Sequence, residues 1–300
     1  MLKWVFTTGL CTFLLFGGQA QLKRFYSLGD VQSFDTVDFT LTATSGISFL
    51  RHVDGGNPLA IYGNPDLNKI NPSFDAKVVN RKCIASLSLD EFRTSGLGDG
   101  LAYAFGGAKE KKEEDPNYWK FLLNNQKVYN LNLNYGIGSS DIDLGGTKCS
   151  SLKVQTGNAE VVVAYGRERA NLITMDTFFL KVDFGSIKAL NLEKSRAENI
   201  IAEIGFGQAE LDLGQLNKNG CNVRAAVGAG TLDICIPKQV PIIIEIKDSP
   251  FCSIDMHKDF EEVETNVYVN RQYASDADNL ISFKIDVAIG NVKFDYSLSR

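Results

Sequence analysis

Six glycines of the chain each lie between two runs in which apolar and polar residues alternate. They are Gly138, Gly157, Gly185, Gly207, Gly230 and Gly290. The residues three and five places before each glycine are apolar or aromatic in every unit, from Leu133 and Tyr135 to Ile285 and Val287. Alternation with period two is the pattern of a strand that buries one face, and helical spacing does not produce it. Each unit therefore predicts a strand, a glycine corner and a second strand.

The second strands keep the same register in five of the units. Their apolar residues, four and six places after the glycine, are Ile142 and Leu144, Val161 and Val163, Leu211 and Leu213, Ile234 and Ile236, and Phe294 and Tyr296. After Gly185, Leu190 and Leu192 come one place later, which predicts a bulge. A slip of one residue would turn every side chain outward, so the common register predicts one shared core.

The spacing of the corner glycines indicates a stack of short coils. From Gly138 to Gly230 they are separated by roughly twenty to thirty residues, enough for two strands and their turns. A unit this short cannot bury its apolar face alone, whereas stacked units share a core. Glycine is expected at a corner that needs a positive φ or lies close to the next coil. The sequence predicts an all-β solenoid with glycine-cornered coils.

The first twenty residues have the pattern of a secretory signal peptide. Lys3 precedes an apolar run from Leu10 to Phe16, and small residues lead to a predicted cleavage between Ala20 and Gln21. The run is shorter than the roughly 20 apolar residues that span a bilayer. We therefore expect an exported chain without a stable membrane anchor.

The rest of the chain divides by regularity. After Gly46, apolar residues alternate in another phase, through Ile47 and Phe49. We predict a signal peptide over 1–20, irregular N-terminal β coils over 21–127 and a regular β-solenoid over 128–300, with one continuous domain over 21–300 as the alternative.

Three segments are predicted to leave the regular pattern. Residues 54–72 carry paired glycines and three Asn-Pro steps, which are typical of a loop. Residues 106–119 are charged with mixed sign, which favours a solvated loop over an interaction tail. Residues 253–266 are interpreted as a loop or short helix that extends from the surface, where solenoids often bind partners.

Cysteine count and charge limit the classes of function. Five cysteines follow the signal peptide, namely Cys83, Cys149, Cys221, Cys235 and Cys252. An odd number leaves at least one thiol free or paired to another chain in an oxidising compartment. They show no CxxC spacing, so a zinc site has no support. The formal net charge of −5 argues against a nucleic-acid partner, which would require a basic surface.

The acidic residues after the corners are weak candidates for a site. Asp143, Asp212 and Asp295 lie five places after their glycines and should project outward in one column. Val162 and Cys235 interrupt that column, and calcium requires six to eight oxygens. Glycosidic chemistry by two carboxylates would need a pair that the sequence does not single out, although Asp141 and Glu210 are further outward residues.

Histidines and basic turns offer two other hypotheses. Cys252, Asp255 and His257 form the sharpest catalytic arrangement available, while an ordinary surface histidine is the alternative for both His257 and His52. The turn residues Arg81, Lys82, Arg167 and Arg169 could contact an anionic glycan or lipid head group, or could keep the edges of the solenoid soluble. We assign no catalytic, cofactor-binding or metal-binding residue, and expect no cofactor.

The unit NLNLNYGIGSSDIDLGGTKCSSLKVQTGNAEVVVAYG resembles the bacterial toast-rack proteins, exported β-solenoid domains of the head GIN adhesin type. The similarity is clearest over Leu131–Ile236 and Leu280–Ser297. It implies a single-stranded right-handed β-helix in the bacterial periplasm or on the cell surface, and it transfers no catalytic residue.

These observations lead to one expected function and two alternatives. We expect an exported, non-enzymatic binding or structural module at the bacterial cell envelope, a candidate adhesin whose partner is an envelope protein or glycan. The first alternative is a β-helical polysaccharide lyase or hydrolase. The second is an envelope-stress sensor or accessory domain.

Overall fold

The computed structural model describes residues 23–29, 33–91, 117–166, 169–214 and 220–296. The predicted signal peptide and its cleavage site, Ala20 and Gln21, lie outside the described residues, as does Arg167. The described chain consists of strands and one short 3-10 helix, η1 (Leu192–Ser195), which confirms the all-β prediction. None of these described segments is a helix long and apolar enough to cross a membrane.

The strands form two rows of parallel neighbours. Row A contains, in spatial order, β15 (Ile242–Lys247), β19 (Ile281–Val287), β13 (Cys221–Val227), β11 (Ala197–Ile204), β9 (Met175–Val182), the first halves of β8 (Cys149–Ala164), β7 (Val128–Asp143) and β2 (Thr36–His52), and β5 (Lys82–Glu91). Row B contains β16 (Ser253–Asp255), β20 (Asn291–Tyr296), β14 (Thr231–Ile236), β12 (Gln208–Asp212), β10 (Ser186–Ala189), the second halves of β8, β7 and β2, and β6 (Tyr118–Leu123).

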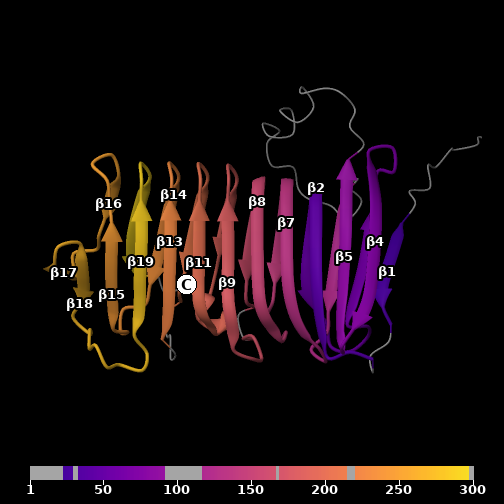
Figure 1. The fold of residues 1–300 in the computed structure, drawn as a ribbon, viewed down its shortest axis with the longest axis horizontal. Coiled ribbons are helices and arrows are strands. Elements are labelled where there is room, and N and C mark those ends of the chain that lie inside the picture. Colours follow the sequence, from indigo (N-terminus) through magenta and orange to yellow (C-terminus); the bar gives the residue numbers. More distant parts are fainter. Residues whose placement is uncertain (1–22, 30–32, 92–116, 167–168, 215–219, 297–300) are drawn as a thin grey trace, which may run out of the picture.

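The order of the strands in space differs from their order in the sequence at both ends. In Figure 1, β19 lies between β13 and β15, and β20 pairs with both β14 and β16 in the same way. At the other end β2 lies between β7 and β5. The long interval between Gly230 and Gly290 therefore holds a coil formed by β15 and β16. This coil lies outside the coil formed by β19 and β20, although it precedes that coil in the sequence.

Antiparallel strands extend both ends of the rows. β1 (Arg24–Leu28) pairs with β3 (Leu59–Asn64), which pairs with β6, and β4 (Ile70–Val79) pairs with β5. At the other end β17 (Phe260–Glu264) pairs with β18 (Val267–Asn270), which pairs with β15. The loop predicted over 54–72 is thus wrong where it contains β3 and the start of β4, and the loop or helix predicted over 253–266 is wrong where it contains β16 and β17.

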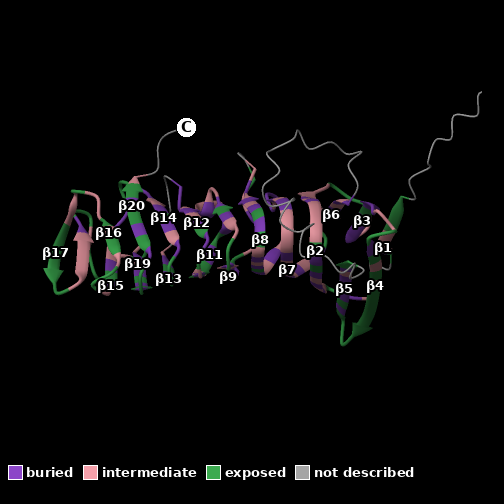
Figure 2. Cartoon of the chain, turned by 90° about the horizontal axis from the view of Figure 1, so that it is seen from above, coloured by how far each residue is buried: buried purple, intermediate pink, exposed green. Residues whose placement is uncertain are grey.

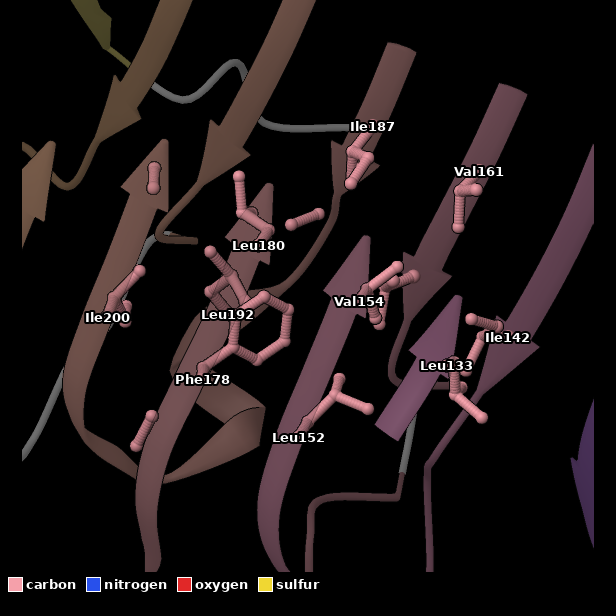
Figure 3. Packing of buried hydrophobic residues seen from close by; sticks show 14 of the residues in the cluster. Leu133, Ile142, Leu152, Val154, Val161, Phe178, Leu180, Ile187, Leu192 and Ile200 are labelled. Atoms are coloured by element: carbon pink, nitrogen blue, oxygen red, sulfur yellow. The ribbon is translucent and has the colours of Figure 1, made fainter. Parts of the chain in front are cut away.

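One continuous hydrophobic cluster joins the two rows from Leu28 to Phe294. Buried and exposed residues alternate along the strands in Figure 2, and in Figure 3 row A side chains such as Leu180 point toward row B side chains such as Ile187. All twelve residues predicted to be inward before the corners are buried, which confirms the period-two pattern. Trp119, at the edge of the segment interpreted as a charged loop, is a core residue of β6.

Two details of the predicted register are wrong. No bulge follows Gly185, because Ile187 and Ala189 are buried and pair in regular register with β8 and β12. Leu192 is instead buried from η1, which begins after Asn191 in the left-handed conformation at φ 55°. The coil of Gly157 is offset by two residues, so that Ala159 lies beside Gly138 and Gly185. A shift of two leaves the inward face unchanged.

The corner glycines stack on one another through their backbones. A Cβ on Gly207 would overlap the carbonyl oxygen of Gly185, and a Cβ on Gly230 would overlap that of Gly207. The same carbonyls accept hydrogen bonds from Gln208 and Thr231, each at 3.0 Å. Of the six predicted corners, Gly138 alone has a positive φ, 119°. Close approach between coils, rather than backbone conformation, thus explains most of these glycines.

Buried asparagines organise the turns that lead back into row A. Asn124, Asn171 and Asn270 are all nearly inaccessible. The Asn171 amide donates to the carbonyls of Cys149 at 2.7 Å and Ser195 at 3.2 Å, and its Oδ1 accepts from the Cys149 N–H at 2.8 Å. One side chain therefore satisfies backbone groups of two neighbouring coils.

We expect Gly207→Ala to lower the free energy of unfolding by about 1–3 kcal/mol, because the new methyl group must displace the Gly185 carbonyl. Urea denaturation measures the change. Gly29→Ala is the control, since the described residues place no heavy atom within 4 Å of its Cβ. Equal stability of the two variants would contradict the close-approach explanation.

We expect Asn171→Ala to cost about 1–3 kcal/mol for each backbone group left unpaired in the interior. Thermal unfolding compares it with Asn199→Ala, whose amide makes one bond, to the Asp176 carbonyl, at the surface. A loss no larger than that of the control variant would show that water replaces the Asn171 bonds.

Candidate interaction surface

A line of exposed apolar side chains follows the glycine corners over five neighbouring coils. Each is the residue immediately before the corner position, and we call the set the ridge: Phe184, Phe206, Ala229, Ile289 and Phe251. Phe184, Phe206, Ile289 and Phe251 are 66%, 68%, 64% and 78% exposed, and Ala229 is also exposed. Large apolar side chains this exposed and this contiguous are typical of interaction sites.

The backbone at the corner holds the ridge in place. The Phe206 N–H donates to the Asp183 carbonyl at 2.8 Å, and the Ala229 N–H donates to the Gly205 carbonyl at 2.8 Å. The residues after the four corners other than Gly185 donate to the corner carbonyl of a neighbouring coil, as Ser253 does to Gly290 at 3.1 Å. The rings of Phe184 and Phe206 stack with centroids 5.4 Å apart and planes 6° apart. The ridge is therefore ordered by the same stacking that orders the coils.

A second line of side chains runs beside the ridge. Its members are the first outward residues of the row B strands, and we call them the polar ladder: Ser186, Gln208, Thr231, Asn291 and Ser253. They are neighbours in strand register, with Gln208 opposite Thr231 and Thr231 opposite Asn291. All five are uncharged and partly or fully exposed. The ladder offers hydroxyl and amide groups along the whole length of the ridge.

Some of the charged residues near these two lines are paired with one another. Lys188 lies 3.5 Å from Glu210, and Lys181 lies 4.0 Å from Asp183. In the three coils that follow that of Asp183, the residue two places before the corner has a small side chain or none. These residues are Gly205, Gly228 and Ala288. Glu203, Asp233 and Asp255 are exposed on strands β11, β14 and β16, so carboxylates outnumber basic groups around the ridge.

The ridge was not predicted, although the sequence carries a signal for it. An apolar residue, the corner residue and an uncharged polar residue recur as FGS, FGQ, AGT, IGN and FCS. The periodic pattern concerns the inward residues three places and more from the corner, whereas the ridge residue lies in the turn itself. A search for repeats at the corner would have found it.

The acidic candidates serve the structure. Asp143 Oδ1 accepts the N–H groups of Gly145 and Gly166, both at 2.9 Å, and Asp212 Oδ1 accepts that of Gly214 at 3.0 Å. Asp141 pairs with Arg51 at 2.5 Å. The predicted column is also broken in register, because Asp143 lies opposite Ala164. Across the described ranges no three His, Cys, Asp or Glu side chains are grouped to hold a metal ion.

Cys252, Asp255 and His257, the residues of the catalytic hypothesis that we did not adopt, each make other contacts. The Cys252 thiol donates to the Ser249 carbonyl at 3.1 Å, and Asp255 lies opposite Lys293. His257 lies 3.7 Å from Asp259 and contacts the Tyr296 ring at 4.4 Å. A hollow of about 280 Å³ beside it is lined also by Lys238, Arg271 and Gln272. His52 lies instead beside Arg169 at 3.3 Å, at the other end of the chain.

The Cys149 thiol is buried, and the basic residues of the turn at Arg81 pair with acidic side chains of the same protein. None of the five cysteines of the described residues forms a disulfide, and burial raises the pKa of Cys149 to about 12, so that its thiol is not a nucleophile at neutral pH. Arg81 holds Asp35 through two bonds of 2.7 Å, which lowers the pKa of that carboxyl, and Lys82 lies 3.1 Å from Asp38. These contacts give no support to an anionic ligand at that turn.

Comparison with solved structures finds distant likenesses. A "putative cell adhesion protein" from Clostridium sporogenes is 14% identical, over 92% of this chain and 99% of that one, with a TM-score of 0.42. A "putative adhesin" from Bacteroides fragilis is 14% identical over 91% and 96%, with a TM-score of 0.37. A "putative lipid binding protein" from Parabacteroides distasonis is 10% identical over 91% and 96%, with a TM-score of 0.32. These scores are too low to carry an argument about function, and no curated protein matches the chain in sequence.

A family model matches part of the chain. Residues 102–177 match the N-terminal domain of toast_rack, DUF2154, a segment that includes β6, β7 and β8. The match begins before Leu131, where the similarity was expected to become clear, and ends well before Ile236. Over residues 102–177, the resemblance to the toast-rack family is confirmed.

Proposed function

We propose that the protein is an exported, non-enzymatic binding module at the bacterial cell envelope, and that the ridge is its binding surface. The observation that carries this proposal is the exposure of Phe184 and Phe206, at 66% and 68%, in one line with three further apolar residues. Exposing phenylalanine to water is unfavourable, and a contiguous apolar line is explained by a partner that covers it.

We further infer that the two rows are the faces of a single-stranded right-handed β-helix. Each pass of the chain from β8 to β14 supplies strands to row A and row B in alternation. A connection that leaves one strand and returns to a parallel neighbour is right-handed in nearly all proteins. The corner glycines then lie along one edge of the helix, and the ridge projects from that edge.

The amino-terminal sequence supports export to the periplasm or the cell surface. Its short apolar run and small residues before Gln21 have the composition of a cleaved signal rather than of an anchor. A rigid stack of coils with a binding edge suits a role in adhesion outside the cytoplasm.

A binding role fits the chemistry of the candidate sites better than catalysis does. The carboxylates Asp141, Asp143, Glu210 and Asp212 are engaged by cations or by backbone N–H groups. The hollow beside His257 contains acidic and basic residues, but Asp259 is the single carboxylate among the residues that line it. Hydrolysis of a glycoside ordinarily uses two carboxylates, so this hollow gives the hydrolase alternative little support.

We expect the double variant Phe184→Ser and Phe206→Ser to bind isolated cell envelopes at least about tenfold more weakly than the unchanged chain. Its stability should change little, because both side chains are exposed. A sedimentation assay with purified protein and envelopes measures binding, and thermal unfolding verifies the fold.

Phe25→Ser is the matched control, since Phe25 is 54% exposed on β1 and far from the ridge in sequence. Equal envelope binding by the ridge variant and this control would refute the ridge as the binding surface.

A further inference from the structure

We propose that the ridge and the polar ladder together bind an uncharged linear polysaccharide, which lies along the stack of coils. This proposal rests on the proposed function and specifies the ligand of the same surface. It combines the shape of the surface, the chemistry of its two lines and the charges around it.

The surface is long, narrow and periodic. Neighbouring parallel strands are about 4.8 Å apart, so five coils from Phe184 to Phe251 extend over about 19 Å. Each coil repeats the same pair of groups, one ridge residue and one ladder residue. A linear polymer whose units are about as long as one strand spacing can meet the same pair of groups at successive units.

The two lines match the two kinds of surface that a sugar ring presents. The C–H groups of a pyranose ring form an apolar face, which packs on phenylalanine or isoleucine side chains. Its hydroxyl groups donate and accept hydrogen bonds at the rim, where Gln208, Thr231 and Asn291 offer amide and hydroxyl partners. Ligand sites ordinarily combine apolar contact with a few polar groups that set orientation.

Ala229 makes a low point in the ridge. It lies between the coils of Phe206 and Ile289, and their side chains are about 10 Å apart by strand spacing. A single ring can therefore rest over Ala229 with Phe206 on one side and Ile289 on the other. The opposite ladder residue, Thr231, is the polar group nearest to that position in register.

The charges favour a neutral polymer over an acidic one. Lys188 and Glu210 form an ion pair on the row B face, as do Lys181 and Asp183 beside the ridge. Lys247 and Asp286 are paired at 3.4 Å near the last coil. Attraction of a polyanion would require an excess of basic groups, which the described residues along the ridge do not supply.

The width of the surface argues against a globular protein partner or a second copy. The ridge is one residue wide at each coil, and its five side chains include an alanine. A stable protein interface buries about 800 Å² on each partner, formed by some 20–30 residues. A polymer that meets two side chains per unit matches this narrow surface better.

Affinity electrophoresis with neutral and acidic polysaccharides tests the proposal on the purified full-length protein. Xylan, a mixed-linkage glucan and soluble chitin oligomers are the neutral probes, and polygalacturonate is the acidic one. We expect binding to at least one neutral probe, with little change between low and high salt, and weaker binding to polygalacturonate. Tighter binding of polygalacturonate that is lost at high salt would overturn the proposal.

The polar ladder supplies a second and more specific variant. Gln208→Ala with Asn291→Ala should weaken binding to the neutral polysaccharide about tenfold, as should Phe206→Ser. Asn199→Ala with Asn222→Ala, two outward amides on row A, is the control. If the ladder variant binds as well as this control while Phe206→Ser does not, the ligand is apolar and the proposal is wrong.

Treated envelopes separate this proposal from the proposed function. Periodate oxidises the sugars of an envelope, and protease digests its exposed proteins. Loss of ridge-dependent binding after periodate, but not after protease, is the expected result. Loss of binding after protease treatment alone would agree with the proposed function, but it would show that the partner is a protein and not a polysaccharide. If envelope binding does not depend on the ridge, the proposed function is itself refuted.

Discussion

Direct contact between backbones at the corners is the constraint on which the rest of the structure depends. Gly185, Gly207, Gly230 and Gly290 follow one another along one edge, each against the corner carbonyl of the coil before it. Because no Cβ intervenes, the strands on both sides of the corner reach hydrogen-bonding distance in the same register. The shared register then aligns the inward residues into one core and the outward residues into straight lines.

The same constraint explains how far the sequence predicts the fold. Period-two alternation identified the inward residues before every corner, because strand geometry leaves few alternatives. It could not distinguish Gly157 from Ala159 as the corner, since a shift of two keeps the same face inward. Nor could it place β19 between β13 and β15. These strands have similar apolar patterns, so which of them pair is decided by contacts between distant parts of the chain. Asn171 and Trp119 were missed for a related reason. Their burial is decided by turns and pairings that local composition does not reveal.

The candidate site was predicted less well than the fold. The acidic residues and His257 drew attention because their side chains carry chemistry, yet their contacts are mostly with neighbouring backbone and with opposite charges. The ridge uses residues with no reactive group, so an inspection for catalytic types passes over it. Its signal is positional, in that exposed apolar side chains recur at the same place, immediately before the corner, in successive coils.

The position of β19 and β20 has a consequence for how the chain is assembled. β15 and β16 are synthesised before these strands, but they join the parallel rows by pairing with them. Until β19 and β20 have been synthesised, one edge of each of β13, β14, β15 and β16 has no parallel partner. β19 and β20 thus close the two rows at this point, and a chain without them would leave the unpaired edges of β13 and β15 exposed to solvent. The core at this end of the molecule is therefore complete only when β19 and β20 have taken their places between these neighbours.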